Sequence, residues 1–467
     1  AQDLLVTHAR LVDGTGAPPR DDTSILIRDG RFVAVGTADQ VEAPAGVREL
    51  DARGRTVIPG LADMHVHFSL GVPLPRRPDE TQVVLARELF YGVTTVLQLG
   101  ATDGDIASIQ RLRAANHQGA PVAPWIYGTG GHLTLPGTHP IYTIFPPPLR
   151  AEADRLTAAT PIDAPVDLVP LGIGVSFVRT EAAARKAVEQ RADGGMDAIK
   201  VTIESGPMPF GDDHPLMGVP MVSAIVEEAH AHQLPVFAHI SSPAELDIAI
   251  ESGVDGIVHT VIDRPLPGPA EAARIAKSGM SVVPTLTLND GAVEYLTAPG
   301  YMDDPFFRAT VTEAEIAALK GDFAGVWIHN WDVNAGPGGE DRPAAMRQHR
   351  ADVLRSVGEM HAAGVPIVVG TDTGNPFVYP GYSVHRELEL LVQAGLTPAE
   401  AITAATHRAA QMLGAEDEFG SIAPGRRADL VILDRDPLAD IRNTRSIAEV
   451  VARGHVIDRA ALQVGAE

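Results

Sequence analysis

The chain has 467 residues, more than one ordinary domain needs, so we expect one large domain and one smaller one. Its formal net charge of −23 would repel a polyanion, and its 45% apolar residues include no run of about 20 that could form a membrane helix. The absence of cysteine excludes disulfides and thiolate metal ligands. We therefore expect a soluble protein that acts on a small molecule, with no nucleic acid and no membrane as a partner.

The first residues, Ala1 and Gln2, fit a mature terminus left after a signal peptide is cleaved at a small-residue site. On this interpretation the protein is periplasmic or secreted. A trimmed initiator Met would give a similar start, and the protein would then be cytoplasmic. We further expect the chain to form a homo-oligomer.

Both ends of the chain show short β patterns with turn residues between them. Apolar runs lie at 4–12, 24–27 and 32–35, and similar runs recur at 428–434 and 450–458. We therefore predict that residues 1–57 and 414–467 fold together as one small discontinuous β-sandwich domain.

The middle of the chain, 58–413, alternates strand-like apolar runs with amphipathic helical patterns, which is typical of parallel α/β architecture. The strand-like runs are 60–67, 93–99, 122–128, 196–202, 234–239, 253–259, 279–285 and 364–372. Eight such runs predict a (β/α)8 TIM-like barrel, whose active site lies at the C-terminal ends of the strands. Two long connections, 129–195 and 286–363, are expected to form lids or substrate walls.

His65 and His67 lie at the end of the first barrel run. Residues two apart on a strand project from the same face, so both imidazoles can bind one metal ion. The fifth, sixth and eighth runs end in His239, His259 and Asp372. A single such residue is more often a core histidine or a helix N-cap, but strand ends of one barrel converge on one place. The pattern therefore predicts a metal centre.

Lys200 ends the fourth run, and it is one of only four lysines among 37 basic residues. An ammonium beside divalent metals would be repelled, whereas a neutral amine can react with carbon dioxide to give a carbamate that bridges two metals. The alternative is an ordinary ion pair with a nearby carboxylate. We favour the carboxylated lysine.

Two motifs carry a resemblance to a known family. Residues 58–67 read IPGLADMHVH, and residues 420–431 read GSIAPGRRADLV. With them, nearly the whole chain resembles the amidohydrolase superfamily, in particular the subgroup similar to imidazolonepropionase that includes prolidase-like and Xaa-Arg-type dipeptidases. The resemblance implies two divalent ions, expected to be zinc, held by His65, His67, carboxylated Lys200, His239, His259 and Asp372.

The resemblance also implies a substrate-facing histidine after the third strand, and residues 129–132, TGGH, place His132 there. The chain departs from the family near the substrate, where it has Pro207 in place of a common Gly and Thr260 after His259. Because Pro lacks a backbone donor, these changes put dipeptidase specificity in question but leave the metal ligands in place.

These residues predict an amidase or peptidase that attacks a carbon–nitrogen bond with a metal-bound hydroxide. Asp372 would move the proton to the leaving nitrogen, and His132 would stabilise the oxyanion. Alternatives are a lactonase or esterase at the same centre and a mononuclear cyclic-amide hydrolase or deaminase. A non-catalytic relative is a further alternative, which loss of metal ligands would mark.

Candidate substrate residues come from loops near the predicted strand ends. Tyr142 and Phe145 lie in the excursion after the third run and would favour a partly apolar substrate, although packing on the barrel rim is an equal alternative. Arg179 and Arg264 lie near strand ends and could bind a carboxylate, although each could equally be a surface residue.

Overall fold

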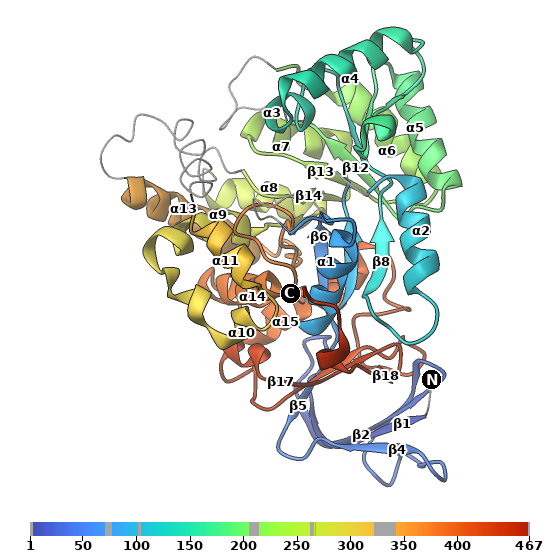
Figure 1. Cartoon of the computed structure of the whole chain (residues 1–467), viewed down its shortest axis with the longest axis vertical. Helices are drawn as coiled ribbons and strands as arrows, with labels where there is room; N and C mark the ends of the chain where they lie inside the picture. Colours follow the sequence, from blue (N-terminus) through green and yellow to red (C-terminus); the bar gives the residue numbers. More distant parts are fainter. Residues whose placement is uncertain are drawn as a thin grey trace.

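The computed structural model describes residues 3–70, 77–100, 104–204, 214–261, 266, 268–321 and 342–465. Strands from both ends of the chain form one eight-stranded sheet at one end of the molecule (Figure 1). The strands of this sheet are β1 (Leu4–Leu11), β2 (Arg20–Arg28), β3 (Arg31–Gly36), β4 (Arg48–Asp51), β5 (Thr56–Pro59), β16 (Leu430–Leu433), β17 (Ile447–Ala452) and β18 (His455–Val456).

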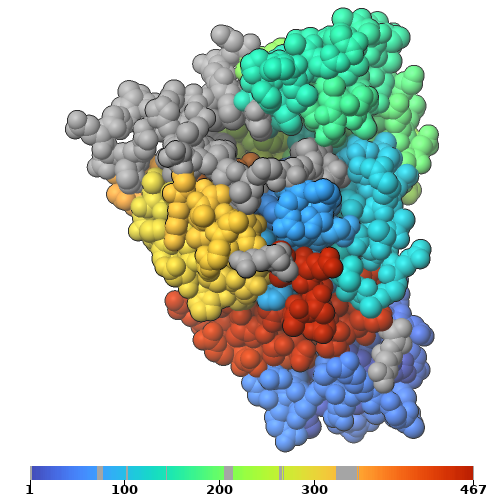
Figure 2. All heavy atoms as spheres, in the orientation of Figure 1, coloured from blue at the N-terminus to red at the C-terminus, as the bar shows by residue number. Residues whose placement is uncertain are grey.

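The two ends of the chain meet where β16 pairs with β5 in antiparallel register, Leu430 opposite Pro59 and Leu433 opposite Thr56. A buried aliphatic cluster that includes Leu4, Val57 and Leu430 packs on this sheet. In Figure 2 the N-terminal residues, in blue, and the C-terminal residues, in red, occupy adjoining parts of the molecule. The structure thus joins the β segments predicted at both ends, while a separate domain bounded at 57 and 414 stays a prediction.

The middle of the chain supplies two further sheets. The first has three parallel strands, β6 (Leu61–Val66), β7 (Val93–Gln98) and β8 (Trp125–Gly128). The second has seven strands in the order β10-β11-β9-β12-β13-β14-β15. Their bounds are β10 (Val166–Asp167), β11 (Val175–Phe177), β9 (His132–Thr134), β12 (Ile199–Thr202), β13 (Val236–His239), β14 (Gly256–Val258) and β15 (Ser281–Val283).

The eighth predicted strand, 364–372, is not a strand in the structure; this prediction was wrong. The segment makes two isolated parallel bridges, Ile367 with Val282 and Thr373 with Val66. Pro366 has no backbone N–H, and Asp372 has a left-handed φ of 64°, so neither residue can continue a regular ladder.

Backbone hydrogen bonds nevertheless connect the two central sheets. On one side, Val368 N donates to Val282 O at 2.9 Å and Met64 N donates to Val369 O at 3.0 Å, so the 366–373 segment lies between β15 and β6. On the other side, Asp197 N donates to Gly128 O at 3.0 Å, which links the end of β8 to the residues before β12. The strand ladders therefore define two sheets. The 366–373 segment joins them at one edge through several backbone hydrogen bonds, and the bond between Asp197 and Gly128 links them at the other edge.

Helices follow most of the central strands (Figure 1). Their bounds are α1 (Glu80–Phe90), α2 (Ile106–Asn116), α3 (Ile141–Ile144), α4 (Pro147–Ala159), α5 (Glu181–Asp193), α6 (Val219–Ala231), α7 (Pro243–Ser252), α8 (Pro269–Ser278), α9 (Leu286–Thr297), α10 (Pro305–Arg308), α11 (Glu313–Leu319), α13 (Arg342–Ala362), α14 (Tyr382–Gln393), α15 (Pro398–Ala404) and α16 (His407–Met412). Short 3-10 helices lie at Val169–Leu171, Pro299–Asp303, Ile441–Arg445 and Arg459–Ala461.

The start and end of α7 show why these helices form where they do. Ser242 and Glu245 make a capping box, Pro243 opens the first turn, and Gly253 ends the helix with φ 73°. The helix thereby begins four residues after His239 and fixes the exit of β13. No helix in the described ranges is long and apolar enough to span a membrane.

Candidate metal centre

His65, His67, His259 and Asp372 lie together although they come from three different segments. Asp372 Oδ1 lies 3.3 Å from His65 Nε2 and 3.0 Å from His67 Nε2, and Asp372 Oδ2 lies 3.9 Å from His259 Nε2. Ligand atoms of His65, His259 and Asp372 all lie within 4.8 Å of one another. This spacing suits a carboxylate and imidazoles that share one cation.

His239 and Lys200 extend this group from the seven-stranded sheet. The rings of His239 and His259 have centroids 4.5 Å apart. Lys200 pairs in register with Phe237 on one side and with His132 on the other, so the three side chains project from the same face of the sheet. Lys200 is also close enough to lower the pKa values of His65 and His239. The structure thus brings the six predicted ligands to one place.

Burial keeps the imidazoles neutral. The pKa values of His65, His132, His239 and His259 all lie well below the ordinary value, primarily because burial disfavours the charged form. A neutral imidazole is the form that binds metals. Burial alone would raise the pKa of Asp372, but His67, His259 and Lys200 nearby lower it overall, so this carboxylate is ionised.

Lys200 is fully buried, and its Nζ has no hydrogen-bond partner among the described residues. Burial lowers its pKa to about 7, while Asp372 and Glu204 oppose that shift. A substantial fraction of the amine is then neutral near pH 7, as carbamate formation requires. Burying an amine without a hydrogen-bond partner costs free energy. The surroundings of Lys200 therefore fit an amine that carries a carbamate or contacts a metal ion.

Asp63 lies directly behind the ligands. Its carboxylate accepts hydrogen bonds from His65 N at 3.1 Å, Thr371 N at 2.9 Å and Thr371 Oγ1 at 2.5 Å. These bonds tie the end of β6 to the segment that carries Asp372. Asp372 N in turn donates to His65 O at 2.8 Å. The backbones of His65 and Asp372 are therefore joined both directly and through Asp63.

Several histidines are oriented by a second contact. His67 Nδ1 lies 3.0 Å from Gly100 O. A carbonyl only accepts, so Nδ1 carries the proton and Nε2 presents its lone pair toward Asp372. His259 Nδ1 contacts Thr285 Oγ1 at 2.7 Å, and His132 Nδ1 contacts Thr202 Oγ1 at 3.1 Å. Such outer partners fix ring orientation in metal sites.

His132, predicted to face the substrate, lies beside the metal candidates. Its ring centroid lies 6.1 Å from that of His67, and its Nε2 is buried without a hydrogen-bond partner among the described residues. The close approach of Gly100, where an added Cβ would lie 1.9 Å from the His132 ring, leaves no room for a larger residue there. The His132 ring is therefore packed closely against Gly100.

Sequence reasoning missed a second group of candidate ligands, His139, Glu204 and His239. Their ligand atoms all lie within 4.8 Å of one another, and His239 Nε2 is hydrogen-bonded to Glu204 Oε2. A signal for Glu204 was available, because Lys200, Thr202 and Glu204 are spaced two apart and residues so spaced project to one side of a strand. His139 had no such signal, since it lies in an irregular stretch between β9 and α3.

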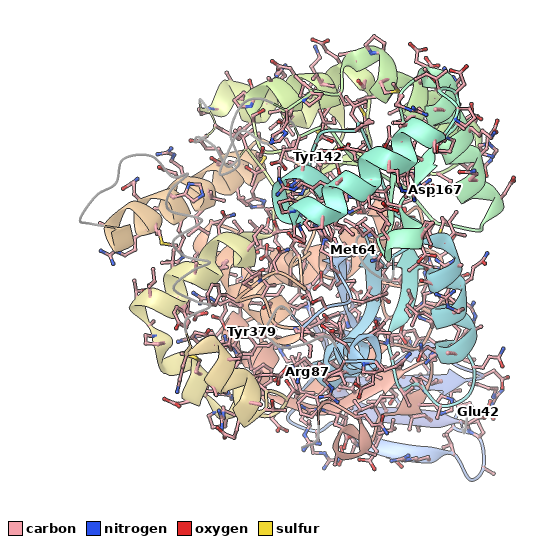
Figure 3. The ribbon with its side chains drawn as sticks, turned by 45° about the horizontal axis from the view of Figure 1, so that its top comes forward. Glu42, Met64, Arg87, Tyr142, Asp167 and Tyr379 are labelled. Atoms are coloured by element: carbon pink, nitrogen blue, oxygen red, sulfur yellow. The ribbon has the colours of Figure 1, made fainter. Side chains whose placement is uncertain are left out.

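The predicted substrate residues lie in different surroundings. Tyr142 and Phe145 pack against a cluster that includes Ile173 and Phe177, and the Tyr142 hydroxyl donates to Asp154. Figure 3 shows Tyr142 on the helical layer formed by α3 and α4. These contacts favour the packing role over a substrate role.

Arg179 is not brought to the histidine group. Its guanidinium donates to the backbone carbonyls of Thr157, Thr160 and Pro161, at 2.6–2.9 Å. These bonds hold the end of α4 and leave little of the guanidinium for a substrate carboxylate. Arg264 and Pro207, also singled out in the sequence, lie outside the described residues.

A model of the amidohydrolase family matches residues 56–457. The chain belongs to the amidohydrolase family. This match confirms the family predicted from the motifs at 58–67 and 420–431, and it makes the protein a hydrolase. The match also covers all six predicted ligands together with the strands that carry them.

Curated relatives and solved structures agree with this family. An imidazolonepropionase from Symbiobacterium thermophilum is 27% identical and covers 97% of each chain. An ochratoxinase from Aspergillus niger is 27% identical over 95% of this chain and 83% of its own. The crystal structure of an A. niger ochratoxinase superimposes with a TM-score of 0.73 at 20% identity, over 98% of this chain and 95% of that chain. A Xaa-Pro dipeptidase with methionine bound in its active site has a TM-score of 0.70 at 21% identity, over 98% of this chain and 100% of its own.

Proposed function

We propose that this amidohydrolase uses two divalent metal ions, expected to be zinc, to hydrolyse an amide or peptide-like C–N bond. The substrate would be small and partly apolar, of the dipeptide or N-acyl amino acid type. The observation that carries the proposal is the convergence of His65, His67, His239, His259 and Asp372. The carboxylate is ionised, and the imidazoles of His65, His239 and His259 are neutral. Lys200, carboxylated, would complete the ligand set.

The residues present fit such ions. Neutral imidazoles and a carboxylate are ligands that zinc prefers. Lys200 Nζ is buried without a hydrogen-bond partner among the described residues, and an anionic carbamate at this nitrogen would be stabilised by the divalent ions. When bound there, two divalent ions would lower the pKa of a coordinated water to about 7 and polarise the scissile carbonyl.

Asp372 would take the proton from the attacking water and pass it to the leaving nitrogen, which otherwise departs poorly as an anion. Its lowered pKa keeps it ready to accept that proton. His132, whose Nε2 faces no described partner, would donate to the oxygen on which negative charge develops. Both side chains are held by neighbours, since His132 Nδ1 contacts Thr202 Oγ1 and Asp372 Oδ1 contacts His67 Nε2.

The fold that positions these groups is proposed to be a (β/α)8 barrel at 58–413, flanked by a β-sandwich domain from 1–57 and 414–467. Two observations support closure. The 366–373 segment bonds to β15 and to β6, and Gly128 O accepts from Asp197 N at the other junction. In such a barrel the ligands would all lie at the C-terminal face, where active sites of this fold occur.

One observation favours a second candidate, a mononuclear hydrolase of cyclic amides. His65, His67, His259 and Asp372 make a complete set for a single ion without Lys200 or His239. The 27% identity to an imidazolonepropionase also supports this candidate. A lactonase or esterase at the same centre stays a chemical alternative, because esters have a better leaving group.

A hydrolysis screen tests the proposal. Purified protein would be assayed against dipeptides, N-acyl amino acids, aryl amides, cyclic amides and lactones, before and after a chelator and again after zinc is returned. We expect turnover of an open-chain amide that the chelator abolishes and zinc restores. Activity confined to lactones or cyclic amides, or activity that survives metal removal, would contradict the proposal.

A further inference from the structure

We propose that Glu204 and His139 bind the second divalent ion of the centre directly, beside His239. This inference rests on the proposed function and deepens it, because neither residue belongs to the ligand set that the family resemblance implies. Glu204 would add a carboxylate and His139 an imidazole beside His239.

The three side chains are close enough to share one ion. Their ligand atoms all lie within 4.8 Å of one another, whereas two ligand atoms of a tetrahedral zinc lie about 3.4 Å apart at bond lengths of about 2.0–2.2 Å. His239 Nε2 is hydrogen-bonded to Glu204 Oε2, and the rings of His139 and His239 stack with centroids 4.7 Å apart. Small side-chain adjustments would therefore bring all three onto one cation.

Hydrogen bonding sets the tautomer of His139. The Thr143 hydroxyl donates to Pro140 O at 3.3 Å, so toward His139 Nδ1, 2.8 Å away, the same hydroxyl acts as an acceptor. His139 Nδ1 then carries the proton, and its Nε2 presents a lone pair.

Glu204 and His139 therefore both present hydrogen-bond acceptors beside His239. Glu204 is 3% exposed and His139 is 9% exposed, so neither is well hydrated. A carboxylate and a lone-pair nitrogen turned toward one place repel a third acceptor and attract a cation.

Lys200 lies within the electrostatic reach of both groups, because Asp372 and Glu204 each affect its pKa. A carbamate on Lys200 would bridge an ion held by His65, His67 and Asp372 to an ion held by His239, Glu204 and His139. Glu204 would then add a negative charge to the second ion that the expected ligand set does not provide.

The direct test is a crystal structure of the full chain loaded with zinc chloride, with anomalous data at the zinc edge. We expect a peak within about 2.2 Å of a Glu204 oxygen and of a nitrogen of both His139 and His239. A second zinc bound by His239 and His259, with Glu204 only accepting from the His239 ring, would overturn the inference and leave the proposed hydrolase intact. No second zinc would overturn the inference together with the two-metal proposal.

Zinc affinity in solution gives an independent readout. Glu204→Gln keeps the shape and an acceptor for the His239 ring but removes the charge, and His139→Phe keeps a ring to stack on His239. Loss of an outer partner costs about 10–100-fold in affinity, so a direct ligand should cost more than about 100-fold for the second zinc. The first zinc should be unaffected.

Two matched variants control for general effects. Glu228→Gln changes a carboxylate on α6, and His117→Phe changes a histidine stacked on Trp125, outside both His groups. Both should bind two zinc ions like the unaltered chain. Unchanged affinity of Glu204→Gln and His139→Phe for the second zinc, with circular dichroism showing a native fold, would contradict direct binding.

Discussion

Asp372 depends on its backbone as much as on its carboxylate. Its φ of 64° turns the chain at the point where the segment after β15 meets β6, and Asp63 holds the preceding residue, Thr371, through two hydrogen bonds. A residue in the left-handed region costs free energy unless its surroundings require it. Here the strain places the carboxylate between three imidazoles.

Lys200 offers a prediction at the scale of one residue. Lys200→Ala should lose most of the activity and at least one metal ion, because the bridging anion is gone, while the fold survives. Acetate or propionate at high concentration should restore part of the activity by supplying an anion in that place. Initial rates with and without the acid, together with metal analysis, measure both effects.

Lys200→Arg serves as the contrasting variant. A guanidinium stays charged and cannot form a carbamate, so it should recover neither the metal nor the activity. If Lys200→Arg binds two metal ions and turns over substrate normally, Lys200 is not carboxylated and has a structural role.

The sequence was sufficient to predict the side chains that end strands. His65 and His67 show the period-two spacing of a strand, and His239 closes an apolar run, so position along the chain already indicated their direction. His139 could not be found in this way, because a residue in irregular chain has no periodicity to report its direction. Only the folded structure shows that the loop between β9 and α3 places His139 beside His239.

At the scale of elements, the N-terminus of α9 is capped from a distant helix. Glu387 on α14 accepts hydrogen bonds from Leu286 N at 2.9 Å and Thr287 N at 2.8 Å. The residue before this helix, Thr285, contacts His259 Nδ1. Packing of α14 on α9 therefore fixes the loop that orients a candidate ligand.

Glu387→Gln should destabilise the protein, because an amide nitrogen would face one of the two backbone donors that the carboxylate now satisfies. A buried donor left without an acceptor costs about 1–3 kcal/mol. Urea denaturation of the variant measures this loss, and Glu189→Gln, exposed on α5, should lie within about 0.5 kcal/mol of the unaltered chain. A Glu387→Gln variant as stable as that control would show that the cap contributes nothing.

The α3–α4 layer allows a test of substrate contact against packing. Phe145 and Tyr142 are partly buried against the cluster around Phe177, so Phe145→Ala should cost about 1–3 kcal/mol of unfolding free energy. Its activity should fall equally for small and bulky substrates, as measured by kcat/KM for a matched pair. A loss of activity confined to bulky apolar substrates would instead show that these residues contact the substrate.

The elements themselves were only partly predictable. Apolar runs such as 93–99 became strands because both faces of β7 are buried, which the composition already indicates. The run 364–372 is equally apolar, yet Pro366 and the left-handed Asp372 interrupt its ladder. At Asp372, the backbone conformation that places its carboxylate in the site interrupts the strand that the apolar run predicts.

At the scale of the whole molecule, Arg427 connects the terminal sheet to the central strands. Its guanidinium donates to Thr95 Oγ1 on β7 and to Asp429, and it lies over the Trp125 ring at 5.0 Å. The motif at 420–431 that marks the family therefore includes a contact between the two parts of the chain. Homo-oligomer formation stays a prediction from the sequence.

Metal content tests the central claim most directly. Protein purified without chelator and dialysed against metal-free buffer should carry close to two divalent ions per chain by inductively coupled plasma mass spectrometry. Removing both ions should abolish hydrolysis, and activity should return as zinc is restored, reaching its full value at two ions per chain. A fully active preparation that consistently holds one ion or none would contradict the two-metal account.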